Sequence, residues 1–271
     1  MKNEAQAHES GTLKTVSRAT DVIDVLLRHR SIGVTALADQ LSLSKSTAHT
    51  YLKTLENCGY VVRNGNEYTL SYELSLLGES IRNQSYLYQI ARDEIDELAN
   101  ETGQYAHLTI EENGKAINLY QAKGDDAATY NYQNRKVQQP EHLHMTAAGK
   151  AILAALPKST VRSILDIHGL PRQTPNTITE RDALFEELAA ISDRGYAYNE
   201  EEEIQGFRAV GAPICGSDGT VLGAVSVSGP TGVLNDDLFH EECTELVTRT
   251  ANLIEVTINM SSEQERSRIL Q

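Results

Sequence analysis

The stretch LADQLSLSKSTAHTYLKTLENCGYVVRNGNEYTL, residues 37–70, decides how the N-terminal part of the chain folds. Ser44 is a favourable N-cap residue, because its hydroxyl can accept a hydrogen bond from a backbone N–H of the first helical turn. The residues that follow repeat apolar side chains at spacings of three and four, which predicts an amphipathic helix. Its apolar stripe consists of Ala48, Tyr51, Leu52 and Leu55.

The opposite stripe of this helix is polar but carries no carboxylate, since the chain has no acid between Gln40 and Leu55. Hydroxyl, imidazole and ammonium groups suit phosphate oxygens and base edges in the major groove of DNA. The positive end of the helix dipole adds to this attraction. An ordinary solvated helix face is the alternative interpretation. We predict DNA contacts from Ser44, Lys45, Ser46, Thr47, His49, Thr50 and Lys53.

After this helix, apolar residues recur at every second position instead of every third or fourth. Residues 60–63 and 67–70 alternate as strands do, and Asn64-Gly65-Asn66 lies between them. An Asn-Gly pair between two such strands is a strong hairpin signal. The hairpin would form a wing, and Arg63 on it is a further predicted contact with the DNA backbone or minor groove.

Two helices are predicted before the polar one. Apolar residues recur at helical spacing from Val16 to Leu27, and Thr35 can cap a short helix that ends at Leu41. Helix, helix, turn, helix and hairpin is the order of a winged helix-turn-helix. A winged helix that binds a protein rather than DNA has the same order, so this alternative stays open.

Charge is distributed unevenly along the 271 residues, whose net charge is −14. The first 80 residues hold eight Lys/Arg against nine Asp/Glu, and the other 191 hold sixteen against twenty-nine. Such an acidic chain does not coat nucleic acid or anionic membrane over its whole surface. It fits a protein of a halophile, where a dense acidic surface maintains solubility.

The cysteines and the lengths of the apolar stretches indicate in which cellular compartment the protein is expected. Three scattered cysteines, Cys58, Cys215 and Cys243, make neither a disulfide framework nor a CxxC metal site. The polar start MKNEAQAHES does not resemble a signal peptide, and no stretch approaches 18 apolar residues. We therefore expect a cytoplasmic protein with no membrane partner.

The C-terminal two thirds of the chain mixes strands with helices. A second Asn-Gly hairpin is predicted over residues 104–120, and further strands over 196–199, 209–215 and 221–227. Helices are predicted over 145–156, 178–193 and 234–260. A largely antiparallel sheet with helices around it is an α+β domain.

Three motifs in this region, together with residues 37–70, resemble the IclR-type transcriptional regulators. They are HMTAAGKAILAALP at 144–157, RGYAYNEEEEIQGFRAVGAPI at 194–214 and VLGAVSVSGP at 221–230. The resemblance covers about residues 14–260 in the same order. It implies an α+β fold, with an N-terminal winged helix-turn-helix followed by a GAF-like α/β effector-binding domain.

The resulting domain organisation is a disordered tail over residues 1–12, a winged helix-turn-helix over 13–71, a linker helix over 72–88, an effector-binding domain over 89–260 and a C-terminal tail over 261–271. Gly78 and the polar residues 83–85 mark the expected hinge in the linker.

The resemblance also implies a pocket for a small-molecule effector, for which an organic or sugar acid is the expected class. Ser226 and Ser228, two apart on a strand, point to one face of the sheet, where they either line this pocket or satisfy backbone groups in the core. Departures from the family pattern are Asn199 in place of Asp, Ala209 in place of a polar residue, and Met145 in place of Ala. The matched pocket positions are Ala147, Ala148, Asn199, Ala209, Ser226 and Ser228.

As a regulator, the protein is expected to bind a pseudo-palindromic double-stranded DNA operator as a homodimer or a dimer of dimers, because one recognition helix reads one half-site. An enzyme or a protein-interaction adaptor that carries a winged helix is the alternative. The sequence has no GxSxG, HExxH or P-loop, so no catalytic residues are assigned. We expect no cofactor. A zinc ion could be bound by His142, His144 and Cys215, since zinc prefers these side-chain types. The His-x-His spacing alone is weak evidence, so no metal site is assigned.

Overall fold

The computed structural model describes residues 11–127, 140–236 and 238–260. The expected C-terminal tail and all but two residues of the expected N-terminal tail lie outside this part. The chain forms two compact units, residues 1–81 and 82–271. The boundary falls within the linker helix α4 (Glu73–Gln84), which is continuous through Gly78. A break follows at Ser85, whose side chain caps the next helix by accepting from Tyr88 N.

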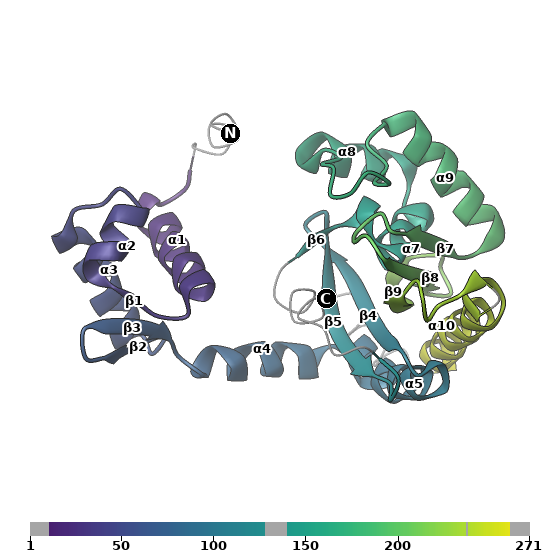
Figure 1. Cartoon of the computed structure of the whole chain (residues 1–271), viewed down its shortest axis with the longest axis horizontal. Coiled ribbons are helices and arrows are strands. Elements are labelled where there is room, and N and C mark those ends of the chain that lie inside the picture. The colour runs from purple at the N-terminus through teal and green to yellow at the C-terminus, as the bar shows by residue number, and fades with distance from the viewer. Residues whose placement is uncertain (1–10, 128–139, 237, 261–271) are drawn as a thin grey trace. The chain divides into compact units, whose positions relative to one another are not determined.

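The first unit is the winged helix-turn-helix that residues 37–70 predicted (Figure 1). Its three-stranded antiparallel sheet has the order β1-β3-β2, with the hairpin of β2 and β3 as the wing. The helices bury apolar residues that include Leu26, Leu37 and Leu52 against Tyr68 of the wing. The elements are α1 (Lys14–His29), β1 (Ile32–Gly33), α2 (Val34–Gln40), α3 (Lys45–Asn57), β2 (Val61–Asn64) and β3 (Glu67–Leu70).

The cap predicted for α2 is wrong. Gly33, not Thr35, occupies the N-cap position, and α2 begins at Val34. The reason is the short strand β1, in which Ile32 and Gly33 pair with Tyr68 and Glu67. This pairing holds Gly33 in an extended conformation, so the helix starts one residue before the predicted cap.

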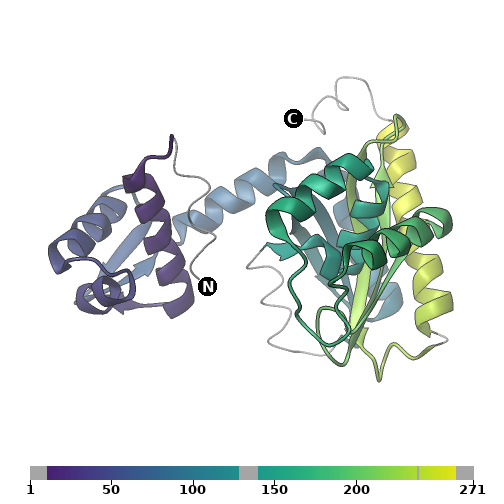
Figure 2. The ribbon, with the colours of Figure 1, turned by 90° about the horizontal axis from the view of Figure 1, so that it is seen from above.

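The second unit is built on a six-stranded antiparallel sheet of order β6-β5-β4-β9-β8-β7. Its strands are β4 (Tyr105–Glu112), β5 (Lys115–Lys123), β6 (Glu141–His142), β7 (Ala197–Glu200), β8 (Phe207–Cys215) and β9 (Val221–Pro230). Its helices are α5 (Tyr86–Thr102), the 3₁₀ turn η1 (Leu143–Met145), α7 (Ala147–Ala155), α8 (Lys158–His168), α9 (Arg181–Arg194), the π-helical η2 (Leu238–Glu242) and α10 (Cys243–Met260). Figure 2 shows the C-terminal helix α10, in yellow, packed beside the green strands of this sheet.

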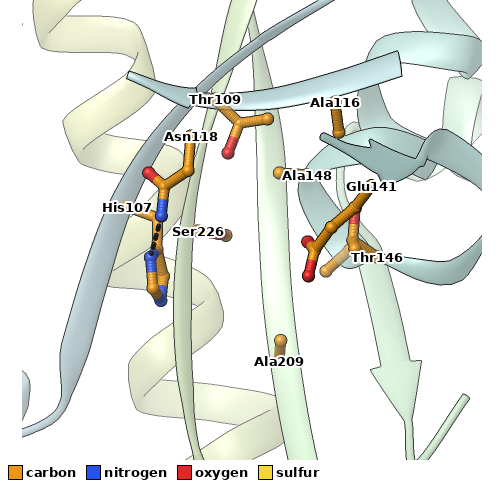
Figure 3. A pocket seen from close by; sticks show the side chains of 10 residues that line it. His107, Thr109, Ala116, Asn118, Glu141, Thr146, Ala148, Ala209 and Ser226 are labelled. Carbon is orange, nitrogen blue, oxygen red and sulfur yellow. Dashed lines mark hydrogen bonds between the residues drawn. The ribbon is translucent and has the colours of Figure 1, made fainter. Parts of the chain in front are cut away.

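One face of this sheet packs against α7 and carries small and polar side chains. His107 of β4 and Ser226 of β9 are cross-strand partners on this face (Figure 3). Ala209 of β8 pairs with Ser228 of β9. Gly211 also belongs to this face, and a Cβ added there would lie 2.8 Å from the backbone nitrogen of Ala148. The absent side chain therefore lets α7 approach β8 closely.

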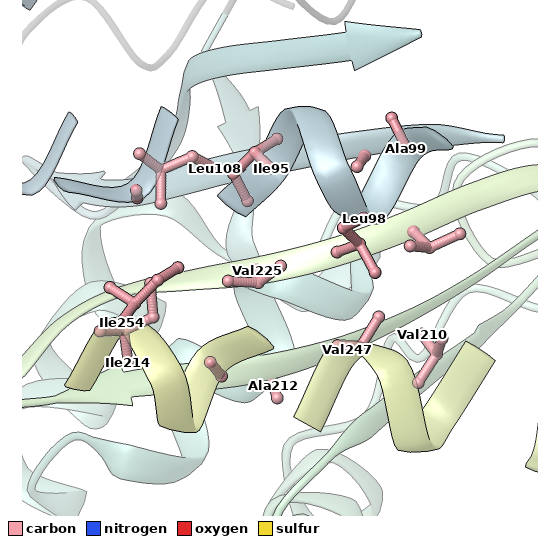
Figure 4. Packing of buried hydrophobic residues seen from close by; sticks show 14 of the residues in the cluster. Ile95, Leu98, Ala99, Leu108, Val210, Ala212, Ile214, Val225, Val247 and Ile254 are labelled. Atoms are coloured by element: carbon pink, nitrogen blue, oxygen red, sulfur yellow. The ribbon is translucent and has the colours of Figure 1, made fainter. Parts of the chain in front are cut away.

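The opposite face is apolar and packs against α5 and α10 (Figure 4). Leu108 and Val225, which alternate with the polar residues of the other face, are fully buried there. Leu98 from α5 and Val247 from α10 complete this core (Figure 4). The alternation along β4 and β9 therefore separates a hydrophobic core from a polar surface under α7.

Two predicted helices need correction, and a third helix, α8, was not predicted from the sequence. The helix predicted from Met145 begins at Ala147, because Leu143–Met145 form a 3₁₀ turn and Thr146 caps α7 by accepting from Gly149 N at 2.9 Å. The closing helix α10 begins at Cys243 rather than at Leu234. None of the helices in the described part of the chain is long and apolar enough to cross a membrane.

Candidate functional site

The exposed face of α3 holds the predicted DNA contacts. All seven predicted residues of the helix are exposed, while Ala48, Leu52 and Leu55 of the opposite stripe are buried. Tyr51, predicted with them, is half-buried. This helix therefore presents to solvent the acid-free surface that the sequence indicated.

The N-terminal end of α3 is a cluster of hydroxyl groups. Ser44 accepts from Thr47 N at 3.1 Å, as the cap prediction required. Its Oγ also lies 2.8 Å from both Ser46 Oγ and Thr47 Oγ1. One turn further, the Thr50 hydroxyl donates to Ser46 O at 2.9 Å. These contacts hold the hydroxyl groups in fixed positions at the end of the helix where its dipole favours a phosphate.

Lys53 and Arg63 have local partners. Lys53 Nζ lies 3.0 Å from Glu56 Oε2, the first acid after the acid-free stretch. On the wing, Arg63 Nε donates to Gly65 O at 2.9 Å, and the guanidinium lies 5.8 Å from the ring centroid of Tyr68. Lys53 must therefore leave a carboxylate to bind phosphate, whereas Arg63 is held in place by the turn of the wing.

Two small cavities lie against the sheet in the second unit, and the first of them also borders the start of α7. Each has a volume of about 10 Å³, which is room for one water molecule. The first cavity is lined by His107, Thr109, Ala116, Asn118, Glu141, Thr146, Ala147, Ala148, Ala209 and Ser226 (Figure 3). The second is lined by Asn199, Glu203, Ile204, Phe207, Arg208, Ala209 and Ser228.

The six predicted pocket positions are brought together around these cavities. Ala147, Ala148 and Ser226 line the first, Asn199 and Ser228 line the second, and Ala209 lines both. An effector larger than water therefore requires the walls to move or the two cavities to join past Ala209.

Sequence reasoning missed the strand β4 as a wall of this site. His107 and Thr109 are buried and line the first cavity, and Asn118 of β5 lies beside them. The signal was present, because these two polar residues alternate with the apolar Ala106 and Leu108 in a predicted strand.

Asn199 has a structural role in addition to its place on the cavity wall. Its amide nitrogen donates to Met145 O, and its amide oxygen accepts from Glu202 N at 3.0 Å. A carboxylate at this position has no hydrogen to donate to the Met145 carbonyl. The amide of Asn199, in place of the Asp that the resemblance implies, therefore makes a hydrogen bond that an ionised carboxylate could not make.

Beside Asn199 lies a buried ion pair. Lys150 of α7 is 2% exposed, and its Nζ lies 2.5 Å from Glu202 Oε1. Burial raises the pKa of Glu202, although the ammonium of Lys150 acts in the opposite direction. Glu187 of α9 approaches Lys150 Nζ at 4.0 Å and binds Arg194 at 2.8 Å. This network fixes α7 to the chain that follows β7.

A cluster of basic side chains lies at the end of the sheet next to the first cavity. The ring of His142 lies 5.7 Å from that of His144 and 6.3 Å from that of His168, measured between centroids. Lys115 Nζ is 3.0 Å from His142 Nε2. Burial, and then the charges of Lys115 and the other two histidines, lower the pKa of His142 to about 4.

The zinc arrangement weighed from the sequence is not formed. Cys215 is at the end of β8, where its backbone N–H donates to Glu255 at 2.6 Å, and it does not join the two histidines. Within the described ranges, no three His, Cys, Asp or Glu side chains gather in a way that could hold a metal ion.

Comparison with known proteins covers both units. A family model described as "IclR helix-turn-helix domain" matches residues 15–65, and one described as "Bacterial transcriptional regulator IclR C-terminal" matches residues 81–256. The "Probable HTH-type transcriptional regulator ArcR" of Halobacterium salinarum is 39% identical over 251 residues, which are 92% of this chain and 95% of that protein.

Solved structures agree with these matches. The crystal structure of the Thermotoga maritima IclR has a TM-score of 0.74 at 27% identity, and the match covers 91% of this chain and 99% of that one. An IclR homolog from Microbacterium hydrocarbonoxydans, crystallised in complex with 4-hydroxybenzoate, has the same fold, with a TM-score of 0.74 at 22% identity over 89% of this chain and 98% of that one. The matches cover both units in the same order and over most of their length. The chain therefore belongs to the IclR family of transcriptional regulators, which are DNA-binding proteins and not enzymes.

Proposed function

We propose that this regulator binds an inverted-repeat operator in the cytoplasm as a homodimer, with α3 of each copy in the major groove. The observation that carries the proposal is the exposed polar face of α3, which holds no acid before Glu56, on a chain whose net charge is −14. The contacts are assigned to Lys45, Ser46, His49, Thr50 and Lys53, with the Ser44–Thr47 cap at a phosphate and Arg63 at the flanking backbone or minor groove.

The homodimer is supported by an apolar seam on α1. Leu13 at the N-cap, Val16 and Leu27 recur at spacings of three and eleven, which are close to whole helical turns and place them on one side of the helix. Leu13 is 75% exposed, Val16 61% and Leu27 49%. The same seam on two copies forms a two-fold interface, and a two-fold axis matches an inverted repeat.

The effector is assigned to these two cavities, and a small organic or sugar acid is the proposed class. The backbone N–H groups at the start of α7, around Ala147 and Ala148, favour a negative charge there. Ser226 and Thr109 add hydroxyl donors to the same cavity. The homolog crystallised with 4-hydroxybenzoate has this fold and binds an organic acid.

The experiment selects binding sites from random double-stranded DNA with the full chain in molar salt. The wild-type protein is expected to enrich one inverted repeat. The Lys45→Glu/Lys53→Glu variant is expected to enrich nothing while its thermal unfolding stays within a few degrees of wild type. Lys123→Glu/Lys158→Glu makes the same change of charge in the other unit and serves as the matched control. Normal enrichment by the α3 variant would show that this helix is not the reading head.

A further inference from the structure

A hydrogen-bonded chain connects the two effector cavities. His107 lines the first cavity, and its Nε2 lies 2.9 Å from Oγ of Ser228, which lines the second. His107 is 1% exposed and Ser228 3%. The imidazole is therefore placed to transmit a change at one cavity to the other. The following inference rests on the proposed role of these cavities in binding an anionic effector.

The orientation of Asn118 decides which nitrogen of His107 carries the hydrogen. One end of the Asn118 amide lies 3.1 Å from His107 Nδ1, and Figure 3 draws the nitrogen at that end. When the amide is turned end for end, its nitrogen donates to Tyr120 O at 2.7 Å and to Leu108 O at 3.2 Å. The oxygen then accepts from His107 Nδ1. This orientation satisfies both ends of the amide, so it is the one we adopt.

The neutral imidazole consequently has its hydrogen on Nδ1 and a lone pair on Nε2. The Ser228 hydroxyl must donate to that lone pair, which uses its only hydrogen. Ser228 then has only oxygen lone pairs left for the second cavity. Lone pairs repel a carboxylate, so this state of the site disfavours an anion.

We propose that His107 controls what Ser228 offers to the effector, and that an anionic effector binds together with one proton on His107. The proton comes from solvent and binds Nε2, so no other bond is made or broken. The new Nε2–H donates to Ser228 Oγ, and the hydroxyl hydrogen of Ser228 turns towards the carboxylate. The charged imidazolium also lies close to the bound anion and stabilises it.

The described residues that line the two cavities include three further charged groups. Glu141 lines the first cavity with His107, and Glu203 and Arg208 line the second with Ser228. The Arg208 guanidinium binds Asp236 at 2.6 Å and approaches Glu200 at 3.6 Å, so its charge is largely compensated. The ring of Tyr105 stacks 6.5 Å from that of His107, and burial raises the pKa of this phenol, so it stays neutral. Among the described residues that line the His107 cavity, Glu141 is thus the second titratable group that could couple to anion binding.

The test measures the rise in unfolding temperature of the full chain with pyruvate, D-gluconate or 4-hydroxybenzoate between about pH 5.5 and 8.5, a range that brackets histidine titration. The three carboxyl groups stay ionised throughout this range. At least one of these acids is expected to stabilise the wild-type protein. Its apparent affinity should fall about tenfold for each pH unit above the midpoint, because one proton binds with each anion.

Three variants distinguish protonation of His107 from titration of neighbouring groups. His107→Gln keeps a hydrogen-bonding group near Ser228 but cannot titrate, so affinity should become independent of pH. Asn118→Asp places a carboxylate against Nδ1, so the midpoint should move to higher pH. Glu141→Gln is the control and should leave the pH dependence as in wild type.

The proposal is overturned if the affinity of wild type does not vary with pH, if the Asn118→Asp midpoint stays in place, or if Glu141→Gln abolishes the dependence. It is also overturned if none of the three acids stabilises the chain. DNA selection without any additive does not depend on these outcomes, so failure of the proton-coupled site is distinguishable from failure of the regulator function.

Discussion

Lys150 and Glu202 form an ion pair of 2.5 Å in the interior of the second unit, with Lys150 only 2% exposed. Lys150 lies one turn into α7, and Glu202 lies in the segment after β7, so the pair joins the helix that borders the first cavity to the edge of the sheet. Asn199 extends this connection to the Met145 carbonyl just before α7. The position of the α7 N-terminus therefore depends on a buried charge pair and on one amide.

Replacing Lys150 with Met should destabilise the second unit by about 3–5 kcal/mol, because Glu202 is left as a buried charge without its partner. Lys150→Met/Glu202→Leu should recover most of that loss, since it removes both charges. Asp166→Asn breaks the exposed pair with Arg181 and should cost at most about 1 kcal/mol. Urea unfolding of each variant at constant salt measures these differences. A double variant as unstable as Lys150→Met would show that the pair itself does not explain the loss.

Replacing Asn199 with Asp should also destabilise the protein, although the resemblance to the family implies Asp at this position. The carboxylate would face the Met145 carbonyl without a hydrogen to donate, at an expected cost of about 1–3 kcal/mol. The loss should shrink at acidic pH as the carboxyl group becomes protonated. The measurement is urea unfolding at neutral and acidic pH, compared with wild type at each pH. An Asp variant as stable as wild type would contradict the assigned role of the amide.

The winged helix-turn-helix was predictable because its signals are local. The cap at Ser44, the stripe that includes Leu52 and the turn at Gly65 each act within a few residues. The three-dimensional site was less predictable, because it depends on strand pairing across the chain. His107 meets Ser228, 121 residues away, and Lys150 meets Glu202, 52 residues away. Neither contact leaves a periodic pattern in the sequence.

Stability of the second unit should decrease as the pH falls from about 6.5 towards 4. The pKa of His142 is lowered from its ordinary 6.5 to about 4, by burial first and then by neighbouring positive groups. Above 6.5 the ring is neutral in both states, so the folded state has its full stability. At lower pH the unfolded chain binds a proton that the folded chain does not, and this favours unfolding.

His142→Asn should flatten this pH dependence, whereas His240→Asn, at an exposed histidine of the same unit, should preserve it. Thermal unfolding over this pH range measures the slopes. His144, whose pKa burial also lowers, leaves a residual slope in the His142 variant. Equal slopes in wild type and His142→Asn would contradict the assignment.

Glu56→Gln should strengthen DNA binding several-fold, because Lys53 is released from the carboxylate at 3.0 Å and becomes available to a phosphate. The gain should be larger at low salt, since counterion release contributes more there. Glu67→Gln removes an acid from the wing and tests whether any loss of negative charge has this effect. Fluorescence anisotropy with the selected operator at several salt concentrations gives the affinities. Weaker binding by Glu56→Gln would mean that Glu56 itself contributes to recognition.

The proposed reading head of this IclR-family regulator is the exposed face of α3, which should bind a specific operator. Genome-wide occupancy of the tagged protein in its host, compared with the Lys45→Glu/Lys53→Glu variant, tests it most directly. We predict a few sharp sites that share an inverted repeat, all of them lost in the variant. Diffuse occupancy of the wild-type protein, or sharp sites that persist in the variant, would contradict the claim and favour a protein-interaction role for the winged helix.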